Sequence, residues 1–466
     1  MVSAICQATY LLSGFSYLQP FIKCLIDYMR FFLSFCVAAS LWCASCNNSA
    51  GSGAATPKED SVVLTDKPAP APAAAVAADT STAFINTTDS LFTLVPHPIH
   101  LQKGIDLNLG VPEGYQISIA YEGLNRLRFL EKSPDGRLFA TDMYDVSDNK
   151  KGKVYVFANW DDSTHRFKNI YTYLSGLHNP NQVAFYHYKG RDIIYIAETG
   201  RLGYYEYHAG DTAATGAYTQ VASFPDYGLS YKYGGWHLTR SLAFHKGRLY
   251  VSVGSSCNAC IEQEAVRATV ISMKPDGSDQ QFFARGLRNS VGIQWVGNQL
   301  WATSMVRDLI GADKPEDLFQ RVDSGRVYHW PYYYQLNGAL YPDQAMHDTA
   351  RQHGLPVPPP PPPAFCGFKA HSAPLGFDYF DGFGDARFNH AFLVALHGST
   401  TVSRQRGNAI VKVLGGNNYT DVVNGFLEGK EEKDRKGRPC DVMMQDATSF
   451  FFTDDYNGVL YYVWKE

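Results

Sequence analysis

A short β-rich phrase recurs six times along the chain, and this repetition constrains the fold more than any other feature. Each copy combines β-branched and aromatic residues, and several copies follow a turn such as Pro134-Asp135-Gly136, as expected for a strand in a hairpin. The copies lie about 50 to 57 residues apart, with one longer interval of about 90 residues between the fourth and fifth. They are residues 136–142 (GRLFATD), 192–198 (DIIYIAE), 247–254 (GRLYVSVG), 298–304 (NQLWATS), 392–398 (FLVALHG) and 449–455 (SFFFTDD).

Repeats of this length, each worth about four strands, are typical of a β-propeller, whose blades stack radially around an axial channel. We therefore predict an all-β protein with a six-bladed β-propeller over residues 91–466. A β-sandwich or a jelly roll explains the density of strands but not their regular recurrence. The long interval contains the proline run 358–363, which cannot join a sheet ladder, and we expect a polyproline loop inserted between repeats.

The composition agrees with this architecture. The chain has 466 residues, of which 45% are hydrophobic and 18% charged, so it can bury a large core. With 30 Tyr, 28 Phe, 40 Gly and 24 Pro, it favours strands and turns over a helix bundle. The formal net charge of -4 makes a nucleic-acid partner unexpected.

The N-terminus carries signals for export. Residues 31–43 form an apolar run that is too short to cross a bilayer but fits the hydrophobic region of a signal peptide. The run leads to Ala44-Ser45-Cys46, which resembles a bacterial lipoprotein signal, with cleavage before Cys46, a lipid on Cys46, and Met29 as the expected true start. The alternative is a cleaved secretory signal without an anchor. Either reading predicts an exported protein, periplasmic or held at the membrane only through a lipid anchor.

The chain thus divides into a signal segment at residues 1–46, a tether at 47–90 and the propeller at 91–466. The tether is rich in Ala, Pro, Ser and Thr and has little that can pack, so we expect it to be disordered.

Four of the nine cysteines lie in the expected propeller: Cys257, Cys260, Cys366 and Cys440. In an oxidising compartment they could form two disulfides. The Cys257–Cys260 pair lacks the following His of a covalent haem site, and no second such pair offers a zinc site. We therefore expect Cys257 and Cys260 to form a local disulfide or to remain two free thiols.

Polar and mostly cationic residues lie just upstream of each phrase, where the innermost strand of each blade is expected to begin. In a propeller these positions surround one mouth of the axial channel. Any one of them could cap a strand or pair with an Asp of a neighbouring blade, but six at one register favour a mouth that binds a compact polyacid. They are Arg126 and Arg128 and residues 180–184, 237–244, 288–293, 371–377 and 438–442.

His237 is the candidate base at this mouth. Arg240 follows three residues later, and a neighbouring cation lowers the pKa of a histidine so that it stays available to accept a proton. A buried core histidine is the alternative.

Several segments, in order across the six blades, resemble the pyrroloquinoline-quinone-dependent sugar dehydrogenases, the soluble glucose/sorbosone dehydrogenase family. The resemblance covers residues 100–466, and its strength lies in the order of the segments rather than in any single one. The segments are 235–244 (GWHLTRSLAF), 247–260 (GRLYVSVGSSCNAC), 285–289 (RGLRN), 307–313 (RDLIGAD), 370–376 (AHSAPLG), 394–399 (VALHGS) and 437–442 (GRPCDV).

The resemblance implies an oxidoreductase that oxidises a sugar or aldose hydroxyl by hydride transfer to pyrroloquinoline quinone (PQQ), bound together with Ca²⁺. A separate acceptor then receives the electrons, since no haem motif is present. His237 matches the general base of the family, and Arg288 matches the residue that polarises the quinone oxygen. Asn289 and Arg438 match contacts to the cofactor.

Further site residues are expected from their positions at the mouth. Arg128, Arg240 and Arg307 are expected cofactor contacts. His371 and His397 are expected with Asn181 in the sugar pocket, the alternative for each histidine being a hydrogen-bonded structural role. The family resemblance implies that backbone carbonyls of Val306, Arg307 and Asp308 bind Ca²⁺.

Three positions depart from the glucose-oxidising members of the family. Val306-Arg307 stands where those members have Gly-Pro, Cys440 replaces a second Arg, and a Lys of the fifth blade is replaced near His397. These departures fit the sorbosone-type branch better.

Two other functions are compatible with the fold. The first is a non-catalytic propeller lipoprotein that binds carbohydrate or a protein, although His237, Arg288 and Arg438 are all retained. The second is a calcium-dependent hydrolase such as a lactonase, which needs a cluster of Asp, Glu and Asn at the axis that the sequence does not reveal.

Overall fold

The computed structural model describes residues 83–89, 92–226, 237–308, 310–399 and 406–466. The signal segment, Met29, Cys46 and the first part of the expected tether lie outside these residues. Within the described ranges, no helix is both long and apolar enough to cross a membrane.

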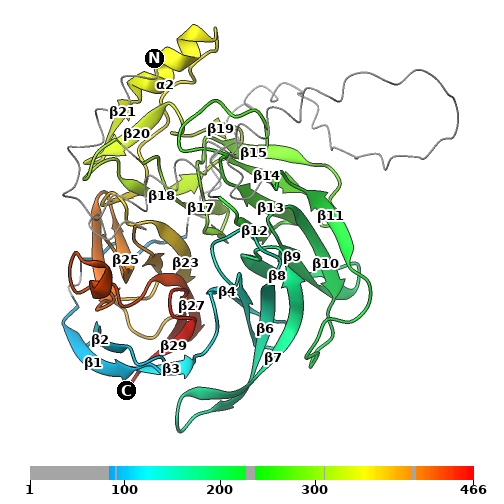
Figure 1. The fold of residues 1–466 in the computed structure, drawn as a ribbon, viewed down its shortest axis with the longest axis vertical. Coiled ribbons are helices and arrows are strands. Elements are labelled where there is room, and N and C mark those ends of the chain that lie inside the picture. The colour runs from blue at the N-terminus through cyan, green and yellow to red at the C-terminus, as the bar shows by residue number, and fades with distance from the viewer. Residues whose placement is uncertain (1–82, 90–91, 227–236, 309, 400–405) are drawn as a thin grey trace, which may run out of the picture. The chain divides into compact units, whose positions relative to one another are not determined.

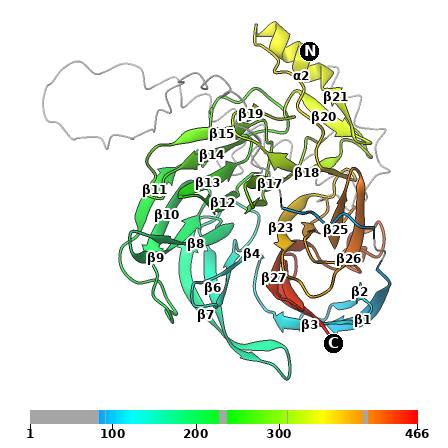
Figure 2. The same ribbon diagram turned by 180° about the vertical axis from the view of Figure 1, so that it is seen from behind.

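Six antiparallel sheets, each of four strands or more, are arranged around a common axis (Figures 1 and 2). This arrangement confirms the prediction of a six-bladed β-propeller. The blades are, in order, β4 (Leu127–Lys132), β5 (Leu138–Asp142), β6 (Gly152–Asp161) and β7 (Arg166–Leu177); β8 (Gln182–Tyr188), β9 (Arg191–Ala197), β10 (Arg201–Glu206) and β11 (Thr219–Ser223); β12 (Arg240–His245), β13 (Arg248–Val253), β14 (Thr269–Met273) and β15 (Gln281–Arg285), extended by β19 (Arg326–Val327); β16 (Ile293–Val296), β17 (Gln299–Ser304), β18 (Asp317–Val322) and β22 (Cys366–Phe368); β23 (Pro374–Phe380), β24 (Ala391–Leu396), β25 (Ala409–Gly415) and β26 (Asn418–Val423); and β27 (Pro439–Asp446), β28 (Ser449–Asp454), β29 (Val459–Lys465) and β3 (Tyr115–Tyr121).

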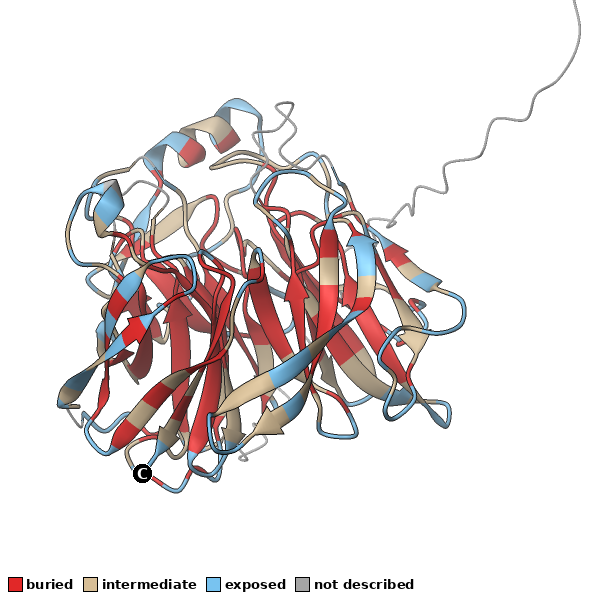
Figure 3. Cartoon of the chain, turned by 60° about the horizontal axis from the view of Figure 1, so that its bottom comes forward, coloured by how far each residue is buried: buried red, intermediate tan, exposed pale blue. Residues whose placement is uncertain are grey.

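The six recurrent phrases form the second strand of each blade, and the cationic segments upstream of them lead into the first strand. The first strands contact one another in a closed ring, from β4 through β8, β12, β16, β23 and β27 back to β4. They therefore line the axis, as predicted. The second strands behind them are almost wholly buried (Figure 3).

The last blade is closed by a strand from the other end of the chain. β3 pairs antiparallel with β29, with Ser118 opposite Tyr462 and Ile117 opposite Val463. This pairing ties the beginning of the fold to its end and completes the four strands of the last blade.

Hydroxyl groups on second strands join neighbouring blades near the axis. Thr141 Oγ1 donates to the carbonyl of Asn181 at 2.6 Å, and Thr453 Oγ1 donates to the carbonyl of Arg128 at 2.7 Å. Each hydroxyl also accepts a backbone N–H from the first strand of its own blade. Apolar clusters fill the space between successive blades, with aromatic contacts such as Trp301 of blade 4 against Phe392 of blade 5.

The predicted position of the proline run is wrong. Residues 323–365 leave blade 4 between β18 and β22, inside a blade rather than between two repeats. This insertion holds a hairpin of β20 (Tyr333–Leu336) and β21 (Ala339–Pro342), the helix α2 (Gln344–Gln352) and the prolines, in yellow in Figure 1. The detour is tolerated because β22 is a three-residue outer strand, so the inner strands of the blade pair without it.

Contacts with the propeller begin inside the segment predicted as a tether. Asn86 Nδ2 donates to the carbonyls of Ala386 and Asn389 in blade 5. A hairpin of β1 (Leu94–His100) and β2 (Asp106–Pro112) follows, and Gly110 pairs with Asn424 beyond the end of β26.

Candidate active site

The expected site residues lie at one mouth of the channel, where first strands begin and second strands end. The register shows this directly, because Leu127 pairs with Asp142 and Pro439 pairs with Asp454. The structure brings the residues at this mouth into two groups, one around His237 and one around Asp455.

His237 sits before β12 with its imidazole buried. Its Nδ1 lies 2.8 Å from the carbonyl oxygen of Ser255, which can only accept, so Nδ1 carries the hydrogen. Burial, followed by the charge of Arg288, holds the pKa of His237 well below its usual range. His237 is therefore a neutral imidazole whose Nε2 offers a lone pair, which is the form that a general base requires.

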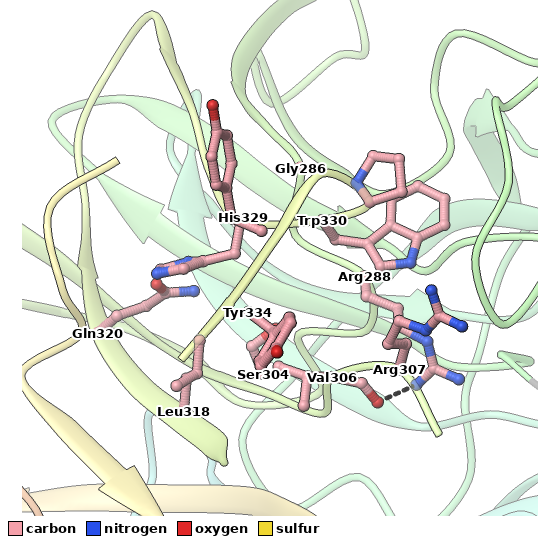
Figure 4. A pocket seen from close by; sticks show the side chains of 12 residues that line it. Gly286, Arg288, Ser304, Val306, Arg307, Leu318, Gln320, His329, Trp330 and Tyr334 are labelled. Atoms are coloured by element: carbon pink, nitrogen blue, oxygen red, sulfur yellow. Dashed lines mark hydrogen bonds between the residues drawn. The ribbon is translucent and has the colours of Figure 1, made fainter. Parts of the chain in front are cut away.

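Arg288 lies beside this imidazole and is held by backbone and side-chain oxygens. Its Nε and Nη2 donate to the carbonyl and to Oδ1 of Asn258, each at 3.0 Å, and Nη1 donates to the carbonyl of Val306 at 2.9 Å. Figure 4 shows Arg288 with Val306 and Arg307 at one wall of a small pocket that His329 and Trp330 of the insertion also line.

Gly254 allows His237 and Asn289 to approach each other. A Cβ atom on Gly254 would lie 2.5 Å from His237 Cβ and 2.7 Å from Asn289 Oδ1. Glycine at the end of β13 thus leaves room for both side chains, and the two residues predicted to share the reacting centre do lie together.

The second group, here called the arginine cluster, comprises Arg126, Arg128, Arg438, His397 and Asp455. Asp455 accepts from Arg128 Nη1 at 2.6 Å and from His397 Nε2 at 2.6 Å. Arg126 Nε lies 3.4 Å from the same carboxylate. Arg438 donates to the carbonyls of His397 and Gly398.

The charges in the arginine cluster do not balance. Burial alone would raise the pKa of Asp455, but Arg126, His397 and Arg128 outweigh it and keep this pKa well below its usual range. Burial, followed by the charge of Arg438, lowers the pKa of His397 to about 3, so this ring is neutral at pH 7. Arg126 and Arg128 therefore share the Asp455 carboxylate, and Arg438 adds a third positive charge nearby without bonding to it.

This surplus of positive charge fits a multiply anionic ligand. Arg126 Nε is buried and makes no hydrogen bond, although it lies near Asp455. A buried N–H without an acceptor is costly, and a carboxylate group supplies the missing acceptor. The residues present thus fit a compact polyacid such as a tricarboxylic quinone.

Three of the expected contacts are placed elsewhere by the structure. Arg240 is completely buried and donates to the carbonyls of His237, Thr239 and Pro225, so it holds the backbone that carries the base. The Asn181 side chain is equally buried, bonded to Arg128 and Ser241 between blades, and does not reach a sugar pocket.

The third is Arg307, whose Nη1 donates to Asp343, the N-cap residue of α2. The guanidinium of Arg307 thereby fastens the insertion to the mouth loop instead of facing the arginine cluster.

Two of the three backbone carbonyls expected to bind calcium already accept hydrogen bonds. The carbonyl of Val306 accepts from Arg288 at 2.9 Å, and the carbonyl of Asp308 accepts from Asn258 Nδ2 at 3.0 Å. These oxygens are already engaged by N–H donors, and one of the donors is a cation.

His371 lies next to this loop, with Nδ1 3.4 Å from Asp308 Oδ1 and Nε2 3.3 Å from the carbonyl of Gly311. His397 lies instead in the arginine cluster, bonded to Asp455. The two histidines expected in the sugar pocket are therefore part of different groups at the mouth.

A disulfide joins Cys257 and Cys260, with the Cα atoms 6.2 Å apart. Cys366 and Cys440 are free and buried, so the second disulfide considered from the sequence does not form. The described residues hold one set of three side chains with metal-ligand spacing, Cys257, Cys260 and Glu262, and two of its three members are joined in this disulfide.

Acidic residues also lie along the axis, which the sequence did not reveal. Asp441 Oδ2 accepts from the backbone of Leu130 at 2.9 Å, and Asp378 Oδ2 accepts from the backbone of Met444 at 2.8 Å. Each carboxyl bridges two blades through a backbone N–H. They act as inter-blade ties and do not form the open acidic cluster that a lactonase needs.

Four contributors to the mouth were missed at the sequence level: Arg126 as a partner of Asp455, Asp455 itself, Ser255 and Asn258. Asp455 carried a signal, because it is the second of two consecutive Asp residues at the end of the last recurrent phrase. Ser255 and Asn258 carried none, since their roles depend on how one loop folds back.

No family model matches the chain. The chain is 24% identical over 412 residues to an uncharacterized protein of Borreliella burgdorferi, a match that covers 82% of this chain and 98% of that protein.

Solved structures match the fold more informatively. The holo form of the PQQ domain of pyranose dehydrogenase from Coprinopsis cinerea matches with a TM-score of 0.60 and 15% identity, covering 78% of this chain and 98% of that domain. The calcium structure of a Trichoderma reesei protein of Carbohydrate-Active Enzymes Family AA12 matches with a TM-score of 0.58 and 17% identity. This match covers 82% of this chain and 100% of that chain. The chain thus has the fold of these propeller domains, in line with the expected resemblance to quinone-dependent sugar dehydrogenases.

Proposed function

We propose that the protein is an oxidoreductase that binds pyrroloquinoline quinone at the mouth and oxidises the hydroxyl of a sugar or aldose. The observation that carries this proposal is the presence, at one mouth, of a neutral buried imidazole and of three arginines, two of which pair with one carboxylate. The likeness to a pyranose dehydrogenase PQQ domain supports it at the level of the fold.

The residues of the chain divide the work in this proposal. When bound, the quinone supplies the oxidising power by accepting a hydride from the substrate carbon. The arginine cluster would hold the carboxylates of the quinone and so fix its orientation. His237 Nε2 accepts the proton of the substrate hydroxyl, because Nδ1 is already committed to Ser255.

Arg288 supplies positive charge beside the base. Burial lowers its pKa, yet a guanidinium starts from 12.5, and its bonds to Asn258 and Val306 hold it in place. A fixed cation next to the reacting oxygen stabilises the negative charge that develops as the proton leaves.

The proposal extends to the setting of the enzyme. We propose export, with a lipid on Cys46 as the membrane anchor, and transfer of electrons to a separate acceptor. The disulfide between Cys257 and Cys260 supports an oxidising compartment.

The test is reduction of an electron-accepting dye by the purified apo-protein after addition of pyrroloquinoline quinone, with and without Ca²⁺, across a panel of aldoses and sorbosone. We expect dye reduction that needs both quinone and sugar. Absence of quinone-dependent reduction with every sugar contradicts the proposal and leaves a non-catalytic propeller.

A further inference from the structure

One short loop contacts both halves of the reacting centre. Residues 255–260, here called the disulfide loop, follow β13 and are closed by the Cys257–Cys260 bond. Ser255, at one end, accepts from His237, and Asn258, in the middle, accepts from Arg288. The two side chains that the chemistry needs are therefore fixed by the same six residues.

We propose that Asn258, held in place by the Cys257–Cys260 disulfide, is a positioning residue that acts through Arg288. This inference rests on the proposed function, since it assigns Asn258 a part in the same reaction. It also makes the activity depend on the oxidised state of the two cysteines.

Asn258 makes three hydrogen bonds through its side chain and two through its backbone carbonyl. Its Oδ1 accepts from Arg288 Nη2 at 3.0 Å and from the backbone of Asp308 at 2.7 Å, while Nδ2 donates to the carbonyl of Asp308 at 3.0 Å. Its own carbonyl accepts from Arg288 Nε at 3.0 Å and from Trp330 Nε1 at 2.9 Å. Two of the guanidinium's bonds thus come from Asn258 alone.

The disulfide explains how Asn258 keeps this position. The bond spans Cys257 and Cys260, so Asn258 lies inside a ring closed by a covalent link. Beyond the ring, Glu262 accepts from the backbone and hydroxyl of Ser256, which secures the flank of the loop. Opening the disulfide removes the covalent constraint on Asn258 while these hydrogen bonds remain, so Asn258 gains freedom.

A small displacement of Arg288 is enough to matter. A reacting group misplaced by about 1 Å can cost on the order of 100-fold in rate. The position of Arg288 affects the rate of the chemical step in this proposal. The carboxylates of the quinone are held instead by the arginine cluster, which lies on other blades. Loss of Asn258 should therefore lower kcat and leave the affinity for the quinone largely unchanged.

The first test is Asn258→Ala in the full chain, which removes Oδ1 and Nδ2 but keeps the carbonyl that accepts from Arg288 Nε. We expect kcat to fall roughly 10- to 100-fold, with the quinone Kd and the sugar KM within about threefold of wild type. Asn258→Asp retains the acceptor for Arg288 and should recover part of the loss. Asn149→Ala is the matched control, because Asn149 supports a loop of blade 1 and does not contact Arg288.

A second measurement uses the quinone-free protein. Phenylglyoxal modifies accessible arginines, and peptide mapping reports the rate at Arg288. We expect slow modification in wild type and in Asn149→Ala, and modification at least about fivefold faster in Asn258→Ala. An unchanged rate at Arg288 overturns the inference, whatever the activity.

The third measurement addresses the disulfide. A dithiol such as dithiothreitol supplies two electrons and two protons, so that the Cys257–Cys260 bond becomes two thiols and the reagent becomes a cyclic disulfide. We expect kcat to fall as in Asn258→Ala and to return on reoxidation. The Cys257→Ser, Cys260→Ser double variant should show the same low kcat and no further response to the dithiol.

The outcomes separate the two proposals. Wild type without quinone-dependent turnover contradicts the proposed function, and the phenylglyoxal rates still decide whether Asn258 holds Arg288. Wild type with turnover, but with full kcat in Asn258→Ala and in the double serine variant, overturns the inference and leaves the function intact.

Discussion

His237 donates its Nδ1 hydrogen to the carbonyl of Ser255 at 2.8 Å. This bond selects one tautomer of the imidazole and leaves Nε2 as the atom able to take a proton. Because the acceptor is a backbone carbonyl of the disulfide loop, the imidazole is oriented by the main chain and not by a side chain that is free to rotate.

His237→Ala should lower kcat by roughly 100- to 10,000-fold, which is the usual contribution of a general base. Quinone affinity should stay within about threefold, since the arginine cluster is untouched. Single-turnover dye reduction and a binding titration on the same preparation give the two numbers. A variant with wild-type kcat shows that His237 is not the base.

The pH dependence of kcat/KM follows from the same histidine. Burial and Arg288 lower the pKa of His237 far beneath 6.5, so the ring stays neutral as the pH falls through that value. We expect kcat/KM to hold steady between pH 7 and about pH 6 and to decline only in more acidic solution. An acid limb centred at pH 6.5 or above disagrees with a buried neutral base.

Arg438→Ala should weaken quinone retention. Burial lowers the pKa of Arg438 to about 10, so it is charged at pH 7 and its loss removes one of three cations from the cluster. We expect the quinone Kd to rise at least about tenfold, equivalent to about 1.4 kcal/mol. Arg191→Ala serves as the control, because Arg191 forms a surface ion pair with Glu206 on blade 2. Equal quinone affinity in both variants would remove Arg438 from the site.

Asp455→Ala should destabilise the fold. The change leaves Arg126 and Arg128 without their carboxylate and His397 Nε2 without its acceptor, and breaking a buried ion pair costs about 3–5 kcal/mol. Urea unfolding measures the loss. Glu206→Ala, which breaks an exposed pair with Arg191, should cost about 1 kcal/mol or less. A similar small loss in Asp455→Ala would mean that the cluster is not held together by this carboxylate.

Asp441 gives a pH dependence of stability with a definite sign. Burial raises its pKa from 3.8 to about 8, with Asp378 adding to the effect. Between these pH values the folded state keeps a proton that the unfolded state has lost, so this group's contribution to stability falls as the pH rises towards 8. Asp441→Asn removes that dependence. We expect the difference in Tm, variant minus wild type, to grow by at least about 2 °C between pH 5 and pH 8; a constant difference contradicts the raised pKa.

The architecture was accessible from the sequence because the repeat has a short, local signature. Strands such as β5 and β13 follow tight turns and carry alternating or clustered apolar residues, so each phrase could be placed on a second strand without knowledge of its partners. The strand that closes the ring was not identified. β3 is separated from β29 in the sequence by nearly the whole propeller, and the residues of β3 do not indicate which strand it pairs with.

The site was accessible only in part. The repeated register predicted that His237, Asn289 and Arg438 lie at one mouth, and the roles that the family resemblance implies for them stay predictions. The contacts of Arg240 and Arg307 were not predicted correctly. A side chain at the expected register can still bond to backbone carbonyls, as Arg240 does, or to a helix cap such as Asp343, as Arg307 does. The direction in which a side chain points depends on neighbours that are distant in the sequence, and a pattern of residue types does not specify those neighbours.

The claim on which the rest depends is that the mouth binds a compact polyacid, and calorimetric titration of the apo-protein with pyrroloquinoline quinone tests it most directly. We expect saturable binding of one quinone per chain. The affinity should fall as the salt concentration rises, and binding should be lost in the double variant Arg128→Ala, Arg438→Ala. No heat of binding in wild type, or equal binding by that double variant, would contradict the account.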